Sequence, residues 1–188
     1  MHDQRVHDGQ AAVHVTEYDP AWESRFRSQQ NRVSVILAPW LAAPLEHIGS
    51  TSVPGLAAKP VIDMLGPVRS LDEAQDAVPA LAADDWQFWP DDPGRHYRRW
   101  FLRPSPAART HHLHLIAQDD PHVRALLAFR DALRGDPRLR DEYAQLKRQL
   151  ADKHRSNRNA YTNAKSDFVQ RVLRSAGTQA PTRNPLPE

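Results

Sequence analysis

The spacing of apolar and polar residues predicts strands in the first two-thirds of the chain. Residues 44–49 and 60–66 are short apolar runs bounded by glycine, proline and serine, a pattern typical of strands. The second run is apolar on both faces apart from Asp63, which indicates a strand buried inside a sheet. Further strands or extended segments are expected at residues 13–15, 86–89, 97–102 and 111–116. The last two could pair as a hairpin across a long Pro/Ala loop.

Apolar residues at helical spacing mark the remaining segments. Asp19 as N-cap and Pro20 at the first helical position begin a helix that should end before Pro39. Further helices are expected at residues 71–83, 121–133, 137–154 and 158–175. Strands with helices, followed by helices alone, predict an α+β fold.

The same pattern divides the chain into two parts. We expect a small mixed sheet flanked by helices at residues 13–117, and a helical C-terminal part at residues 118–176. Residues 1–12 and 177–188 are polar or rich in proline, and we expect them to be disordered tails. The ligand site should lie in the cleft between the two parts.

Composition and charge narrow the classes of function. The 188 residues suffice for one domain with a core, or for a domain with a helical extension. The net charge is only +2 and no run of lysines and arginines stands out, so nucleic acid is not expected as a partner. Cysteine is absent, which excludes disulfides and thiolate metal sites. No apolar run is long enough to cross a membrane and no signal-peptide core is present, so we expect a cytoplasmic protein without a membrane partner. The oligomeric state stays open.

A Gly/Ser loop between the two central strands is the first candidate site. Gly49, Ser50, Thr51 and Ser52 can bring backbone N–H groups and hydroxyls close to a phosphate. Lys59 adds a positive charge, and Asp63 on the following strand could hold a divalent cation. Such a run by itself is usually an ordinary turn, but the lysine and the buried aspartate that follow favour a site for a phosphorylated ligand.

Two histidines form the second candidate. His112 and His114 alternate with apolar residues, so on a strand both side chains point to the same face. They could bind one metal ion, hold phosphate as imidazolium, or act as acid and base. A solvated strand face or hydrogen-bonded core histidines would produce the same pattern.

Other candidates lie on a strand and on the C-terminal helices. Arg99 belongs to a segment in which arginines alternate with aromatic residues, a pattern that suits phosphate binding but also occurs on ordinary edge strands. Tyr143 and Lys147 are four residues apart, as are Tyr161 and Lys165, so each pair shares a helix face. Lysines at such positions often only cover apolar surface with their aliphatic stems. Because the spacing occurs twice, we favour the interpretation that these residues face a ligand.

Together these motifs resemble the GrpB-like family. The resemblance rests mainly on the segment His47-Ile48-Gly49-Ser50-Thr51-Ser52-Val53-Pro54-Gly55-Leu56-Ala57-Ala58-Lys59-Pro60-Val61-Ile62-Asp63. It extends from about residue 13 to 175 and includes Phe129-Arg130-Asp131, which adds Arg130 to the ligand-binding candidates.

The resemblance implies a minimal nucleotidyltransferase-like fold, in which Gly49 and Ser50 would hold the triphosphate of a nucleotide. Asp63 would be the first metal-binding carboxylate and the catalytic residue, but Leu65 stands where a second carboxylate is expected. His112 and His114 stand near the place of a third. One aspartate with two histidines suits zinc, manganese, nickel or iron better than a pair of magnesium ions. The family's domains also occur fused to dephospho-CoA kinases, which hints at nucleotide chemistry.

We therefore expect a protein that binds a phosphorylated ligand of the nucleotide class. A divalent metal (magnesium, manganese or zinc) would be held by Asp63, His112 and His114. Nucleotidyl or phosphoryl transfer is the leading reaction. The alternatives are a catalytically inactive nucleotide-sensing or interaction module, and a metal-dependent hydrolase that uses the same three residues.

Overall fold

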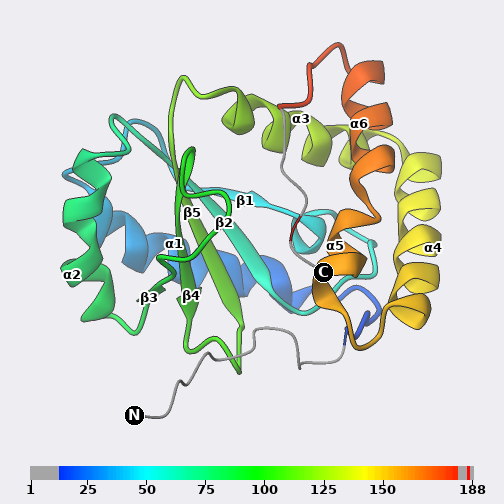
Figure 1. The fold of residues 1–188 in the computed structure, drawn as a ribbon, viewed down its shortest axis with the longest axis horizontal. Helices are drawn as coiled ribbons and strands as arrows, with labels where there is room; N and C mark the ends of the chain where they lie inside the picture. The colour runs from blue at the N-terminus through cyan, green and yellow to red at the C-terminus, as the bar shows by residue number, and fades with distance from the viewer. Residues whose placement is uncertain (1–12, 182–185, 187–188) are drawn as a thin grey trace.

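A five-stranded mixed sheet forms the centre of the computed structural model, which describes residues 13–181 and 186 (Figure 1). The strands lie in the order β1-β2-β5-β4-β3. Their bounds are β1 Glu46–Ile48, β2 Ile62–Val68, β3 Gln87–Phe88, β4 Arg98–Arg103 and β5 His111–Ala117. Strands β2 and β5 are parallel, and the other pairs are antiparallel. The expected α+β fold, a mixed sheet flanked by helices, is confirmed.

Helices cover the sheet and continue into the C-terminal part. Their bounds are α1 Ala21–Leu37, η1 Ser50–Ser52, η2 Glu73–Ala77, α2 Val78–Ala82, α3 Pro121–Gly135, α4 Pro137–Lys153, α5 Arg158–Asn163 and α6 Ser166–Ser175. Figure 1 shows α2 at one side of the molecule and α4, α5 and α6 grouped at the opposite side. No helix in the described part of the chain is both long enough and apolar enough to span a bilayer.

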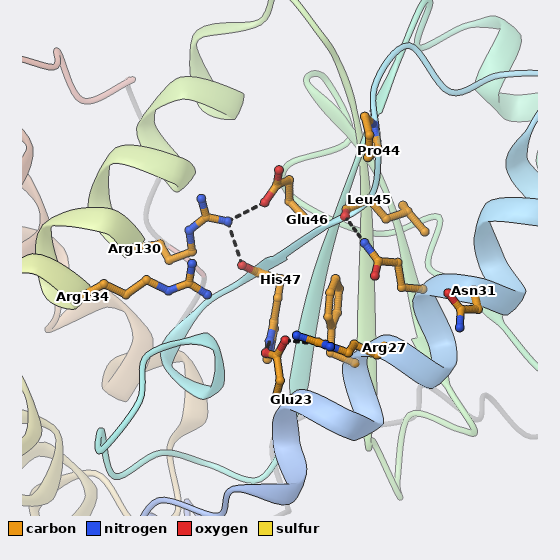
Figure 2. A pocket seen from close by; sticks show the side chains of 11 residues that line it. Glu23, Arg27, Asn31, Pro44, Leu45, Glu46, His47, Arg130 and Arg134 are labelled. Atoms are coloured by element: carbon orange, nitrogen blue, oxygen red, sulfur yellow. Dashed lines mark hydrogen bonds and ion pairs between the residues drawn. The ribbon is translucent and has the colours of Figure 1, made fainter.

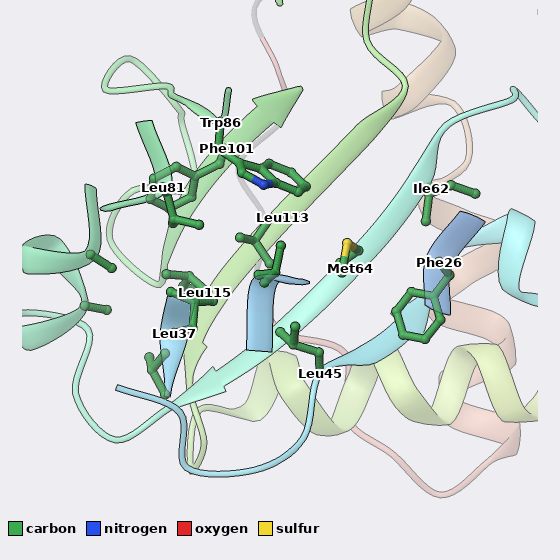
Figure 3. Close-up of a cluster of buried hydrophobic side chains, with 14 of the residues drawn as sticks. Phe26, Leu37, Leu45, Ile62, Met64, Leu81, Trp86, Phe101, Leu113 and Leu115 are labelled. Carbon is green, nitrogen blue, oxygen red and sulfur yellow. The ribbon is translucent and has the colours of Figure 1, made fainter. Parts of the chain in front are cut away.

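The main core lies between the sheet and helix α1, with the short helix α2 beside it (Figure 3). Met64, Leu113, Leu115 and Phe101 point from three adjacent strands into this core, and all four have no exposed surface. Trp22 and Leu37 of α1 close it from the other side. We call this side of the sheet the core face.

The opposite side carries both apolar and polar residues, and we call it the Asp63 face. Ile48, Leu65 and Ile116 pack there against Val123 of α3. Asp63 and His112 lie on the same face, paired with each other across the parallel strands β2 and β5. A single face therefore has an apolar half under α3 and a polar half beside it.

Several expected elements differ from the structure. The helix expected at 71–83 is a 3₁₀ turn followed by the five-residue helix α2, because Pro79 removes a backbone donor from the middle of the segment. The single helix expected at 158–175 is divided into α5 and α6 at Ala164 and Lys165. The extended segment expected at 13–15 is no strand, and only an isolated bridge joins Thr16 to Ala58.

The remaining boundaries agree within a few residues. Helix α1 begins at Ala21, and Asp19 caps it because its carboxylate accepts a hydrogen bond from the Ala21 N–H at 2.9 Å. The hairpin of β4 and β5 is confirmed. Most of the two tails expected to be disordered, 1–12 and 177–188, lies outside the described residues, and the division near residue 117 stays a prediction.

Candidate functional site

The Gly/Ser loop contacts the Asp63 carboxylate directly. Gly49 ends strand β1 with φ of +72°, a conformation that favours glycine. A Cβ atom at this position would lie 2.5 Å from Asp63 Oδ2. The loop can approach the carboxylate this closely only because residue 49 has no side chain.

Two of the three hydroxyls expected to bind phosphate form hydrogen bonds within the loop region. Thr51 Oγ1 donates to the carbonyl of Val61 at 3.1 Å, and His47 Nε2 lies 3.1 Å from the same hydroxyl. Ser52 Oγ donates to the carbonyl of Gly49 at 2.6 Å. Thr51 and Ser52 are both buried, whereas Ser50 is partly exposed. In this structure these two side chains stabilise the loop, and Ser50 is the most exposed of the three hydroxyl residues.

Asp63 and the two histidines form one cluster. His112 Nδ1 lies 2.9 Å from Asp63 Oδ1, and His114 Nε2 lies 3.6 Å from the same oxygen. One potential ligand atom from each residue lies within 4.8 Å of the others, close enough for one metal ion. The prediction that the two histidines share a face, and share it with Asp63, is confirmed.

Arg98 links this cluster to a second carboxylate. Its guanidinium donates to Asp92 at 2.6 Å and 2.7 Å, and Nη1 lies 3.3 Å from Nδ1 of His114. Arginine has no acceptor atom, so Nδ1 of His114 accepts this hydrogen bond and a neutral His114 carries its proton on Nε2, facing Asp63. As arranged here, the Nε2–H of His114 lies 3.6 Å from Asp63 Oδ1. Binding a metal through Nε2 would require that His114 give up the contact with Arg98.

The charges of this cluster follow from burial and hydrogen bonding. Burial by itself raises the pKa of Asp63, but hydrogen bonds from His112 and His114 outweigh it and place the pKa well below its ordinary value. Burial lowers the pKa of His112, and it lowers the pKa of His114 to about 4. Asp63 is therefore an ionised acceptor between two neutral histidines at neutral pH.

Three cations from separate segments lie in this part of the structure: the charge of Asp63 acts on Lys59 and Arg158, and the charge of Arg109 acts on His112. Lys59 precedes β2, Arg109 lies in the loop before β5, and Arg158 is the first residue of α5. Burial, then the charge of Arg158, lowers the pKa of Lys59 to about 8. The same two causes lower the pKa of Arg109 to about 10, and its guanidinium lies 5.6 Å from the ring centroid of Trp100. Positive charge is therefore concentrated beside Asp63.

Tyr143 and Lys147 lie on α4, whereas Tyr161 lies on α5 and Lys165 lies between α5 and α6. Lys147 is 2% exposed, lies 4.8 Å from the ring centroid of Tyr143, and donates to the carbonyl of Ala57. Burial, then the charge of Lys165, lowers its pKa to about 6. Lys165 lies 4.3 Å from the ring centroid of Tyr161. In this structure Lys147 holds the loop that leads to β2.

Two other predicted residues lie away from the cluster. Arg99 pairs with Leu115, so it lies on the core face, and its Nε donates to Gln75 at 2.9 Å. Arg130 donates to Glu46 Oε2 at 2.6 Å and to the carbonyl of His47 at 3.1 Å, which ties α3 to strand β1. The structure does not bring either side chain to Asp63.

The sequence interpretation passed over Arg98, Arg109 and Arg158. Strand alternation could have identified Arg98, because Arg98 and Trp100 fall on the same face of β4 and Trp100 pairs with His114. No local pattern marks Arg109 or Arg158. Both lie in loops or helix starts whose position depends on tertiary packing.

Leu65 occupies the place where a second carboxylate was expected. It has no exposed surface and packs with Ile48, Ile116 and Val123 beneath α3. It pairs with His114 across the parallel strands. The position is therefore part of the apolar half of the Asp63 face.

A separate cavity of about 600 Å³ lies over the edge strand β1, between α1 and α3 (Figure 2). Its charged side chains are largely paired, with Arg27 bound to Glu23 and Arg130 bound to Glu46. Gln30 and Arg130 also cap the outward carbonyls of Leu45 and His47. Asp63, His112 and His114 do not line this cavity.

Comparison with known proteins gives consistent matches. The family model described as "GrpB protein" matches residues 12–175. UPF0157 protein PA4798 of Pseudomonas aeruginosa is 38% identical over 180 residues, covering 93% of this chain and 71% of that protein. UPF0157 protein YqkA of Bacillus subtilis is 34% identical and matches 92% of this chain, which spans about half (49%) of its length.

A solved structure extends the agreement to the fold. The conserved protein GrpB from Enterococcus faecalis superimposes with a TM-score of 0.79 at 34% identity, covering 87% of this chain and 96% of that chain. The matched region includes the Gly/Ser loop, Asp63 and the histidine strand. The chain belongs to the GrpB family.

Proposed function

We propose that this protein binds a phosphorylated small molecule of the nucleotide class at the polar half of the Asp63 face, and that it transfers a nucleotidyl or phosphoryl group. The observation that supports this most is the close approach of Gly49 to Asp63 Oδ2. It places a turn that can contact phosphate against an ionised carboxylate, a combination that suits phosphoryl chemistry.

The residues of the site would fit one metal ion and do not fit two. Leu65 leaves the apolar half without an oxygen ligand, so the two-carboxylate arrangement for paired magnesium ions is missing. Asp63, His112 and His114 offer one oxygen and two nitrogen atoms within 4.8 Å, a set that suits zinc or manganese. A bound ion would polarise a phosphoryl oxygen.

The chain's own groups would then bind and orient the ligand. Ser50 and the backbone near Gly49 would contact phosphate oxygens, and Lys165 would reach the ligand from the helical side. The ionised Asp63, held in place by His112, would accept the proton of the attacking hydroxyl or hold the ion. Catalysis of this kind depends mainly on positioning and charge.

Calorimetry with nucleoside triphosphates, with and without magnesium, manganese or zinc, tests this proposal. We expect saturable binding to the wild-type protein. Ser50→Ala should weaken it about tenfold or more, the size expected for one hydrogen bond to a charged group. Ser166→Ala, at the start of α6, is the matched control and should bind like wild type. A folded protein that binds none of the nucleotides under any of these conditions would rule the proposal out.

A metal-dependent hydrolase is a second candidate, favoured by the 4.8 Å spacing of the three potential ligands. It predicts that purified protein retains a stoichiometric ion. His112→Ala and His114→Ala should both lose it, whereas His154→Ala, on a helix end away from the cluster, should keep it. Unchanged metal content in the first two variants would remove this candidate.

A further inference from the structure

Lys59 and Arg158 differ from the other partly buried cations of the protein. Arg98 forms two hydrogen bonds to Asp92, and Arg130 pairs with both Glu46 and Asp131. Among the residues that the structure describes, neither Lys59 nor Arg158 forms an ion pair with a carboxylate. Within the described residues, Arg98 and Arg130 therefore have carboxylate partners, whereas Lys59 and Arg158 have none.

The chain segments that carry these two charges are held side by side. Thr16 and Ala58, which precedes Lys59, exchange main-chain hydrogen bonds of 2.9 Å, and the Val13 N–H donates at 3.0 Å to the carbonyl of Arg155, three residues before Arg158. Burial lowers the pKa of Arg158, and the charge of Asp63 offsets this only in part. The charge of Arg158 in turn acts on Lys59 and Arg109. Asp63 offers a single negative charge, and its Oδ1 is already contacted by His112 and His114. Holding like charges together at partly buried positions costs free energy that a bound anion would recover.

We propose that Lys59 and Arg158, with Arg109 beside them, form the subsite for the terminal phosphate of the ligand, and that this subsite selects a dianionic phosphate monoester over a phosphodiester. This inference rests on the proposed function, because it assigns a position and a charge state to the same ligand. An arginine and a lysine from different segments can contact different oxygens of one phosphate. A diester carries one negative charge and presents fewer free oxygens, so it neutralises the cluster less well.

The loop hydroxyls support this assignment. The side chains of Thr51 and Ser52 form hydrogen bonds to Val61 and Gly49, so the polar groups available for phosphate lie mainly on the cationic side of Asp63. A ligand could therefore place its reacting phosphoryl group at Asp63 and its terminal phosphate between Lys59 and Arg158.

The first test compares three simple probes by calorimetry with the full chain at pH 8 and low ionic strength. Inorganic phosphate and methyl phosphate should bind at one competitive site, and dimethyl phosphate should bind at least tenfold more weakly. Equal affinities for methyl phosphate and dimethyl phosphate would overturn the selection for a dianion.

The second test uses paired variants. Lys59→Gln and Arg158→Gln should each reduce the affinity for methyl phosphate at least tenfold. Lys153→Gln and Arg155→Gln are matched controls, because both residues are exposed and Arg155 already pairs with Asp152. Thermal unfolding of all four variants should show a folded protein.

The outcomes separate this inference from the proposed function. Nucleotide binding that Lys59→Gln and Arg158→Gln leave unchanged would overturn the subsite and keep the proposed function. A folded wild-type protein that binds methyl phosphate but no nucleotide would support the subsite and refute the nucleotide class. Absence of binding to every phosphate and nucleotide would refute both.

Discussion

The two faces of the central sheet use neighbouring residues of the same strands for different purposes. On the core face, Met64 and Leu113 are completely buried against α1. One residue earlier along each strand, Asp63 and His112 lie on the Asp63 face and form a hydrogen-bonded polar cluster. Strand alternation alone separates these two environments, since successive side chains point to opposite faces.

The Asp63 face also differs from the core face along its length. Helix α3 covers Leu65 and Ile116, and the polar half begins two residues before Leu65. The core face is apolar along β2, and along β5 after His111 at its start. The comparison suggests that the core face provides most of the stability, whereas the polar half of the other face holds charges that are useful only with a ligand.

The largest expected effect comes from extending the polar half into the apolar half. Leu65→Asp would place a carboxylate beneath α3 without a partner, at a position with no exposed surface. We expect a loss of about 4 kcal/mol or more in the free energy of unfolding, the range for an unpaired buried charge. Urea unfolding would measure it, and Leu65→Met, a swap of similar volume, should cost less than about 1.5 kcal/mol.

Gain of a second metal ion by a stably folded Leu65→Asp variant would contradict this view. It would mean that the apolar half of the Asp63 face can serve as part of the site, and that the fold does not require this half to be apolar.

A smaller effect is expected where the Gly/Ser loop meets Asp63. Gly49→Ala would place a Cβ 2.5 Å from Asp63 Oδ2 at a φ of +72°. Displacing the carboxylate or the loop should cost about 2–3 kcal/mol and weaken phosphate binding. Gly135→Ala is the control, because a Cβ there meets nothing within 4 Å at the end of helix α3. It should leave binding unchanged, and a Gly49→Ala variant with the same behaviour would refute the close approach.

Much of the fold could be predicted from the sequence because its signals are local. A continuous apolar run placed β2, alternating apolar residues placed β5, and Asp–Pro pairs marked the starts of α3 and α4. The helix expected at 71–83 failed because apolar spacing suggested it, while Pro79 and packing against the sheet permit only a 3₁₀ turn and a short helix.

The site was only partly predictable, and the reason is physical. Asp63, His112 and His114 were identified because a polar residue within an apolar strand stands out. Arg99 was chosen over Arg98 because the register of β4 against β5 was unknown, and that register decides which arginine shares the face of His114. Lys59 and Arg158 come together through tertiary packing of α5, which no local pattern reveals.

The helices that cover the loop offer a pH-dependent test. The pKa of Lys147 is about 6 in the folded protein, below its ordinary value of 10.5. Between these values the unfolded chain binds more protons than the folded one, so stability should rise with pH. The contribution should approach about 1 kcal/mol per pH unit. Lys147→Met should remove this slope in urea unfolding at pH 7, 8 and 9.

The same variant leaves the Ala57 carbonyl without its donor, which should add a pH-independent loss. Lys153→Met, at an exposed position of the same helix, should keep the wild-type slope. An unchanged slope in Lys147→Met would show that this lysine stays charged in the folded protein.

The smallest effect should be the most informative about the polar half of the Asp63 face. Asp63→Asn keeps an acceptor for the hydrogen bond from His112 but removes a negative charge that acts on Lys59 and Arg158. If the cations bind phosphate directly, methyl phosphate should bind this variant a few-fold more tightly. The repulsion between the Asp63 carboxylate and the phosphate would no longer offset the attraction between the cations and the phosphate. Any bound metal should be lost at the same time. A tenfold weaker affinity for methyl phosphate would instead mean that a metal ion held by Asp63 attracts the anion. The cationic subsite would then contribute less to phosphate binding than a site in which the metal bridges Asp63 and the phosphate.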